Sequence, residues 1–310
     1  MVNSTMHDED GLVHLLPVHR PHALLAAAER VDWIRQERWI QYTRAEEVLV
    51  RLAELLAYPP RDRMPALLLF GATGMGKTRI VHRFVREHGS RFEPQRGTTQ
   101  LPVVALQMPP SPQERDFYEE LLTAMDAAVL AKLSVSHLRQ RVRVLARQFG
   151  VRMLIIDEIH SMLSGTFREQ RIFLNALRFL ANDLRLPLVC VGTPEAKQAL
   201  LTDQQLADRF EARELPAWRD DATFHQFLAS FGASLPLRQA SGLREVGLRK
   251  RILSLSEGIT VRICRLLEEA AVQAILSGRE RIELETLSEE LLTGSLVSIS
   301  ERRQRAAVSP

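Results

Sequence analysis

The chain has 310 residues, 45% of them hydrophobic and 25% charged, with a formal net charge of +3. This length accommodates one large or two modest domains, and the composition is ordinary for a globular protein. The sequence has no apolar stretch of transmembrane length, and its N-terminus lacks the layout of a secretion signal. We therefore expect a cytoplasmic protein without a membrane partner. The small basic excess permits contact with nucleic acid without requiring it.

The first part of the chain predicts an arm followed by a helix. Residues 1–30 are polar, contain several histidines and are interrupted by proline, which predicts a loosely ordered arm. Residues 31–57 predict a helix, because apolar residues recur at helical spacing and Tyr58-Pro59-Pro60 ends the pattern.

Short apolar segments alternate with helical patterns through the middle of the chain. Strands are predicted at residues 66–70, 102–106, 151–156, 188–191 and 211–215, and helices at residues 113–130, 136–148 and 167–184. This alternation is typical of an α/β fold with a mainly parallel sheet covered by helices on both faces. After Trp218 only helices are predicted, at residues 220–231, 244–256, 260–277 and 284–292. These indicate a separate, small helical domain.

The segment after the first predicted strand has the pattern G-x-x-x-x-G-K-T. It consists of Gly71, Ala72, Thr73, Gly74, Met75, Gly76, Lys77 and Thr78. A strand before it and a helix after it supply the context that this phosphate-binding motif requires. The glycines let backbone N–H groups converge on a phosphate of ATP, and Lys77 would reach the β- and γ-phosphates. Thr78 would offer its hydroxyl to Mg²⁺. A chance glycine turn before a helix is the alternative.

Two carboxylates, Asp157 and Glu158, end the predicted strand at residues 151–156. In P-loop enzymes an aspartate at this place holds Mg²⁺, and a neighbouring glutamate orients or deprotonates the attacking water. A helix-capping pair is the alternative. The string Asp-Glu-Ile-His resembles the acidic box of one group of helicases, but no arginine-rich partner motif accompanies it. His160 is therefore interpreted as a surface or helix-start residue.

Three further residues are candidates for sensing the nucleotide. Thr193 follows a strand and would sense the γ-phosphate by a hydrogen bond, with the cap of a Gly-Thr-Pro turn as the alternative. Arg209 precedes the last strand and is the candidate arginine finger, a side chain that would contact the γ-phosphate of a nucleotide bound by a neighbouring subunit. Arg213 is the reserve candidate, and a solvated surface arginine is the alternative. Arg262 opens a helix of the second domain and would reach the phosphates, with Arg265 or a structural salt bridge as alternatives.

In this order the motifs resemble those of AAA+ ATPases, over about residues 45–292. More narrowly, the chain resembles transposon-encoded ATP-binding proteins of the TniB kind, which are related to the target-selection ATPases of Tn7-like elements and to the B protein of phage Mu. The short sequence segments that carry this resemblance are Arg38-Trp39-Ile40-Gln41-Tyr42, Arg44-Ala45, Arg63-Met64-Pro65, Gln107-Met108-Pro109-Pro110 and Ile156-Asp157-Glu158-Ile159-His160. Two departures are Thr193, where asparagine is common, and Arg262, which follows Gly258 by four residues instead of three.

The resemblance implies a P-loop AAA+ sheet sandwiched by helices and followed by a small helical lid. The expected parts are an N-terminal arm and helix (1–44), a nucleotide-binding core (45–218), the lid (219–295) and a basic flexible tail (296–310). It also implies an ATPase in which Lys77, Glu158 and Arg209 are catalytic. Asp157 and Thr78 would position Mg²⁺, and Thr193 and Arg262 would sense the nucleotide.

Proteins of this kind form rings or helical filaments of identical subunits on double-stranded DNA, without sequence preference, and recruit a transposase that carries out the strand transfer. Slow ATP hydrolysis regulates their disassembly. Two segments are candidates for DNA contact. One is the loop 108–116, which contains Arg115. The other is the helix 136–152, where Arg139, Arg143 and Arg147 share a face that could meet phosphates. A solvated helix face without DNA contact is the alternative. An ATPase that remodels a protein partner and a nucleotide-dependent signalling switch remain the alternatives.

Overall fold

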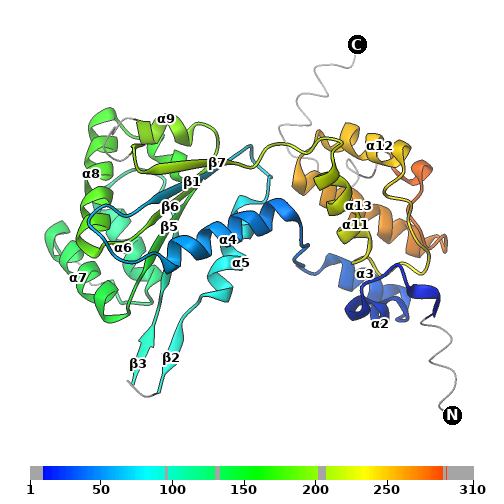
Figure 1. Ribbon diagram of the computed structural model, residues 1–310, viewed down its shortest axis with the longest axis horizontal. Helices are drawn as coiled ribbons and strands as arrows, with labels where there is room; N and C mark the ends of the chain where they lie inside the picture. Colours follow the sequence, from blue (N-terminus) through cyan, green and yellow to red (C-terminus); the bar gives the residue numbers. More distant parts are fainter. Residues whose placement is uncertain (1–9, 95–96, 130–132, 202–206, 289–290, 292–310) are drawn as a thin grey trace. The chain divides into compact units, whose positions relative to one another are not determined.

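The computed structural model describes residues 10–94, 97–129, 133–201, 207–288 and 291, and they form two compact units (Figure 1). The sheet unit is Glu47–Pro216. The helical unit combines Met1–Glu46 with Ala217–Pro310. Among the described residues, segments before Glu47 and after Pro216 thus belong to one unit.

The sheet unit contains a five-stranded parallel sheet in the order β4-β5-β6-β1-β7. Its strands are β1 (Ala66–Phe70), β4 (Val103–Gln107), β5 (Met153–Asp157), β6 (Leu188–Gly192) and β7 (Phe210–Glu214). Every residue of β1, β5 and β6 is buried, as expected for a sheet that is covered on both faces. The predicted α/β class is confirmed. All five carboxyl ends lie at one edge of the sheet, because the strands are parallel.

Helices cover both faces of this sheet. They are α4 (Thr43–Ala57), α5 (Lys77–Glu87), α6 (Glu114–Ala124), α7 (Val135–Gln148), α8 (Phe167–Leu184) and α9 (Ala196–Leu201). Alternate strand residues such as Leu68 and Leu154 pack with Phe117 of α6 and Phe173 of α8 in one apolar cluster. The buried residues of α5 lie outside that cluster, and α5 contacts β4 and β6 from the opposite face. A small antiparallel hairpin, β2 (Arg91–Glu93) and β3 (Thr98–Gln100), was not expected from the sequence.

The helical unit includes most of the segment that we expected to be a loose arm. Its elements are η1 (Asp10–Leu12), η2 (Pro17–His19), α2 (Arg20–Ala23), α3 (Ala27–Arg35), α11 (Ala222–Gly232), α12 (Val246–Ser256), α13 (Thr260–Leu276) and η4 (Leu284–Thr286). Arg30 of α3 is 2% exposed and binds both oxygens of Glu280 at 2.7 Å. Residues 10–35 are therefore ordered by packing, which polar composition does not reveal. Residues 1–9 and the predicted tail 296–310 lie outside the described residues.

Two predicted helices have different bounds in the structure. The helix expected at 31–57 is broken between α3 and α4, because Arg38 stacks on Trp33 at 4.4 Å and donates to its carbonyl, which closes α3. Tyr42 then packs edge-on against Trp218. Of the helix expected at 284–292, residues 284–286 form the short turn η4, residues 287 and 288 are not helical, and residues 289–290 and 292 lie outside the described part. No helix of the described residues has the length and apolarity to span a membrane.

Candidate nucleotide-binding site

The glycine loop joins β1 to α5 at the carboxyl edge of the sheet. A Cβ on Gly71, whose φ is 157°, would lie 2.4 Å from the Leu215 carbonyl oxygen, so this close approach requires glycine. Gly76 has a φ of 91° and is the N-cap of α5. Because a glycine N-cap has no side chain to accept from them, the first N–H groups of α5 stay available to an anion. The loop backbone therefore fits a phosphate.

Lys77 is buried inside this loop. Its ammonium donates to the carbonyl oxygens of Gly71 and Ala72, at 2.7 and 2.9 Å, and the residue is 6% exposed. Burial lowers the pKa of Lys77, while the carboxylates of Glu158 and Asp157 act in the opposite direction. These two carbonyl partners are neutral, so a phosphate oxygen would be a stronger partner for this desolvated cation.

Thr78 and Asp157 meet although they are far apart in the sequence. The Thr78 hydroxyl donates to Asp157 Oδ2 at 2.6 Å, and the backbone N–H of Glu158 donates to Asp157 Oδ1 at 2.8 Å. Asp157 is 9% exposed. A hydroxyl and a carboxylate are the kinds of oxygen ligand that Mg²⁺ uses beside nucleotide phosphates, so the residues present fit the ion. The helix-capping alternative is weak, since Glu158 makes no side-chain cap of η3 (Ile159–Ser164).

Glu158 and Thr193 are linked through His160. The Glu158 backbone is left-handed, with φ 55° and ψ 35°, and its Oε2 lies 3.2 Å from His160 Nε2. The backbone N–H of Thr193 donates to His160 Nδ1 at 3.5 Å. The Thr193 hydroxyl hydrogen-bonds the Glu195 carboxylate and lowers its pKa. The sequence interpretation of His160 as a surface residue missed this contact; its place two residues after Glu158 was the available signal.

Arg209 lies at the amino ends of the strands, whereas the glycine loop lies at their carboxyl ends. Its carbonyl accepts from the N–H of Ala66, the first residue of β1, and its guanidinium donates to Asn182 Oδ1 at 2.7 Å. Five strand residues at about 3.3 Å each separate the two edges by roughly 16 Å. Arg209 is therefore not placed to touch a nucleotide held by the loop of its own chain.

A basic hollow surrounds Arg209. It has a volume of about 580 Å³ and is lined by Arg61, Arg63, Met64, Pro65, Asp208 and Arg209. The reserve candidate, Arg213, lies instead within β7 beside Leu69, and its Nη1 is buried without a hydrogen-bond partner in the described structure. The two arginines thus occupy different places in the sheet unit.

Arg262 and Arg265 are in α13 of the helical unit. Arg262 Nη1 pairs with Glu257 at 2.9 Å, in line with the structural salt bridge that the sequence left open. Its role as a nucleotide sensor stays a prediction.

The arginines that we considered for DNA contact have acidic partners in the same chain. Arg143 and Arg147 both bind Asp183 at 2.6 Å. Arg115 pairs with Glu119 at 2.8 Å, and Arg139 lies 3.7 Å from a carboxylate oxygen of Glu114. These contacts reduce the positive field of the helix face and favour the alternative of a solvated surface. The structure gives no separate support to the loop 108–116.

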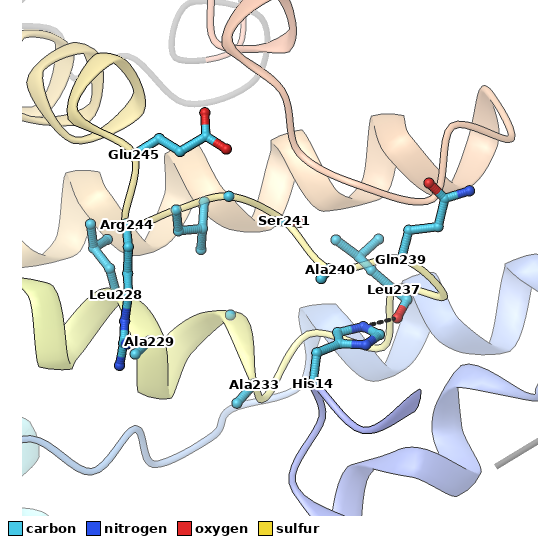
Figure 2. A pocket seen from close by; sticks show the side chains of 13 residues that line it. His14, Leu228, Ala229, Ala233, Leu237, Gln239, Ala240, Ser241, Arg244 and Glu245 are labelled. Carbon is cyan, nitrogen blue, oxygen red and sulfur yellow. Dashed lines mark hydrogen bonds between the residues drawn. The ribbon is translucent and has the colours of Figure 1, made fainter. Parts of the chain in front are cut away.

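A second pocket lies within the helical unit (Figure 2). It has a volume of about 420 Å³ and is lined by His14, by residues of α11 and by residues 237 and 239–245. Figure 2 shows His14 at one end, where its Nε2 lies 3.0 Å from the Leu237 carbonyl oxygen. None of the site residues predicted from the sequence lines this pocket.

The parallel sheet, the glycine loop after β1 and the helical region define an AAA+ fold. Cdc6p from Pyrobaculum aerophilum is similar, with 17% identity and a TM-score of 0.62 over 90% of this chain and 74% of that chain. The ORC1 protein of Aeropyrum pernix in complex with DNA matches with 17% identity and a TM-score of 0.58, over 84% and 68%. The ORC2 protein of the same organism, as ADPNP–ADP complexes, matches with 15% identity and a TM-score of 0.58, over 90% and 74%.

The sequence identifies the chain more narrowly. Residues 30–220 match the family described as bacterial TniB protein. The chain belongs to this family. No curated protein sequence matches it.

Proposed function

We propose that this chain is an ATP-dependent AAA+ regulator of DNA transposition. It binds ATP with Mg²⁺, oligomerises on target double-stranded DNA without sequence preference, and recruits or activates a transposase. The observation that carries the proposal is the meeting of Lys77, Thr78 and Asp157 at one sheet edge in a chain of the TniB family. The transposase, as the partner, performs the strand transfer.

The chemistry at the loop is hydrolysis of ATP to ADP and phosphate. Backbone N–H groups of the loop and Lys77 bind the phosphates, and Thr78 and Asp157 hold Mg²⁺, which neutralises developing phosphate charge when bound. Glu158 accepts a proton from the attacking water, whose oxygen bonds to the γ-phosphorus as the bond to ADP breaks. Thr193 senses the γ-phosphate by a hydrogen bond, and Arg262 is the candidate nucleotide sensor from the helical unit.

The position of Arg209 supports assembly of several copies of the chain. Because Arg209 lies at the far edge of its own sheet, a finger role on the γ-phosphate needs a second copy of the chain. The glycine-loop end of one copy would then meet the Arg209 end of the next copy. Such a heterologous contact, repeated from copy to copy, gives a ring or a helical filament. The DNA complex of the similar ORC1 protein supports DNA as the template for such an assembly.

Sedimentation of the purified protein with plain double-stranded DNA tests this function. We expect a large DNA-bound species with ATP, and none with ADP or without nucleotide. Lys77→Ala is the matched control and should give no such species in any condition. ATP hydrolysis that is indifferent to DNA would overturn the transposition role and favour an ATPase that remodels a protein partner. Tight ADP binding without turnover would favour a signalling switch.

A further inference from the structure

His160 lies between two parts of the nucleotide site that the sequence did not connect. Its Nε2 is 3.2 Å from Glu158 Oε2, and its Nδ1 accepts from the backbone N–H of Thr193. The imidazole also packs directly on the end of β6, since a Cβ on Gly192 would lie 3.3 Å from Nδ1. One aromatic ring thus spans the gap between the end of β5 and the end of β6.

The two contacts are compatible with one tautomer of the ring. In a neutral imidazole whose Nδ1 accepts from the Thr193 N–H, the proton is on Nε2. This Nε2–H points to a carboxylate oxygen, which is a good acceptor. The hydrogen bonds therefore run in one direction, from Thr193 through His160 to Glu158.

The same contacts continue to the glycine loop. The carbonyl of Gly192, next to Thr193, accepts from the N–H of Gly71, the first residue of the loop. A shift of the β6 end when the loop holds a phosphate would therefore reach the imidazole through Thr193. The Glu158 side chain is 36% exposed, so a hydrogen bond from His160 would restrict its rotamers.

We propose that His160 is a positioning residue that orients the Glu158 carboxylate for water activation and ties that orientation to the end of β6 at Thr193. This inference rests on the proposed ATPase function and adds a residue to it. His160 itself exchanges no proton with the substrate. Its role is to hold one carboxylate oxygen so that the other is presented consistently to the water.

Substitutions that keep one of the two contacts separate this role from general stability. In His160→Gln the amide nitrogen takes the place of Nε2 and still donates to Glu158. In His160→Asn the polar atoms reach only the place of Nδ1, near Thr193. We expect His160→Ala and His160→Asn to lower kcat about tenfold, the usual size for a residue that orients a site group. His160→Gln should recover most of that loss, and all three variants should keep the wild-type Kd for ATP.

A double-mutant cycle with Glu158→Gln gives the decisive comparison. Once the carboxylate is absent, His160→Ala should lower kcat no further, whereas a purely structural role would add its loss in both backgrounds. Nitrogen NMR of the nucleotide-free protein supplies a readout other than activity: the Nε2–H tautomer should dominate in the wild type, and the Nε2–H resonance should shift in Glu158→Ala because its carboxylate acceptor is lost.

Additive losses, equal kcat for the Gln and Asn variants, or an Nδ1–H tautomer would each overturn the role of His160 while the ATPase function stands. A wild-type protein that binds ATP but never hydrolyses it would overturn the ATPase function as well.

Discussion

Single residues decide whether the loop can hold a phosphate, and Lys77 is the most constrained of them. Its ammonium is buried and held by two backbone carbonyls, so the cation is preorganised where phosphate charge would enter. Lys77→Ala removes that charge, and we expect ATP affinity to fall at least 100-fold, or about 2.7 kcal/mol. Titration with a fluorescent ATP analogue measures this. Lys250→Ala, an exposed lysine in the helical unit, is the matched control. Unchanged affinity in Lys77→Ala would contradict the loop assignment.

Glu158 is expected to act after binding. Glu158→Gln keeps the size of the side chain but cannot take a proton from water, so kcat should fall about 100-fold or more. ATP affinity should change little, because the phosphates are held by the loop and Lys77. Steady-state hydrolysis together with ATP titration tests this split, and the lifetime of an ATP-dependent DNA complex should increase. Loss of ATP binding in this variant would show that Glu158 has a structural role instead.

The sequence predicts the positions of residues that a contiguous motif carries, while their roles stay predictions. Gly71 to Thr78 are adjacent in sequence, and the apolar strand before Asp157 predicts that this carboxylate reaches the same sheet edge. His160 could not be found in that way. Its partners come from the ends of two different strands, and only the register of β5 and β6 brings them together.

At the scale of elements, the buried pair Arg30–Glu280 fastens α3 to the chain after α13. The Arg30 side chain is 3% exposed and that of Glu280 is 13% exposed. Arg30→Met leaves the carboxylate buried without its partner, and we expect the free energy of unfolding to fall by roughly 3 kcal/mol. Urea denaturation measures the change. The double variant Arg30→Met/Glu280→Gln should be less destabilised, because no unpaired charge remains. Equal losses in both would show that packing, and not the charge, is responsible.

The same pair predicts a dependence on pH. Burial acts to raise the pKa of Glu280, but hydrogen bonds from Arg30 and the Arg238 N–H outweigh it and hold the pKa below its usual 4.5. A carboxyl with a depressed folded-state pKa contributes stability above its unfolded value and loses it as pH falls through the folded value. As the pH falls from about 5.5 to below about 4.5, the free energy of unfolding of the wild type should decrease more steeply than that of Glu280→Gln. Parallel slopes would contradict the assignment.

Elements with a strong apolar signal were predicted closely, and elements shaped by tertiary contacts were not. The predicted strands lie within about two residues of β1, β4, β5, β6 and β7, since buried parallel strands are short apolar runs. The break between α3 and α4 has neither glycine nor proline. It depends on Arg38 and Tyr42 meeting aromatic residues, including Trp218 from the distant end of the chain, which helical spacing cannot reveal.

At the scale of the whole molecule, the glycine loop and Arg209 lie at opposite edges of one sheet. A nucleotide site completed by Arg209 therefore combines two chains, and each chain offers a loop at one edge and the basic hollow at the other. This arrangement predicts that two inactive variants can complement each other, because each supplies what the other lacks at a shared interface.

Arg209→Ala keeps a complete loop and Glu158, whereas Glu158→Gln keeps Arg209. Each alone should bind ATP and hydrolyse it poorly. In an equal mixture with random assembly, about a quarter of the interfaces join an intact loop to an intact Arg209, so hydrolysis should recover to roughly that fraction of wild type. The mixing experiment is measured in the presence of DNA, with Arg213→Ala plus Glu158→Gln as a parallel mixture. Recovery only in the parallel mixture would assign the finger to Arg213. If neither mixture recovers ATP hydrolysis although the variants still co-sediment with DNA, neither arginine acts on a neighbouring chain.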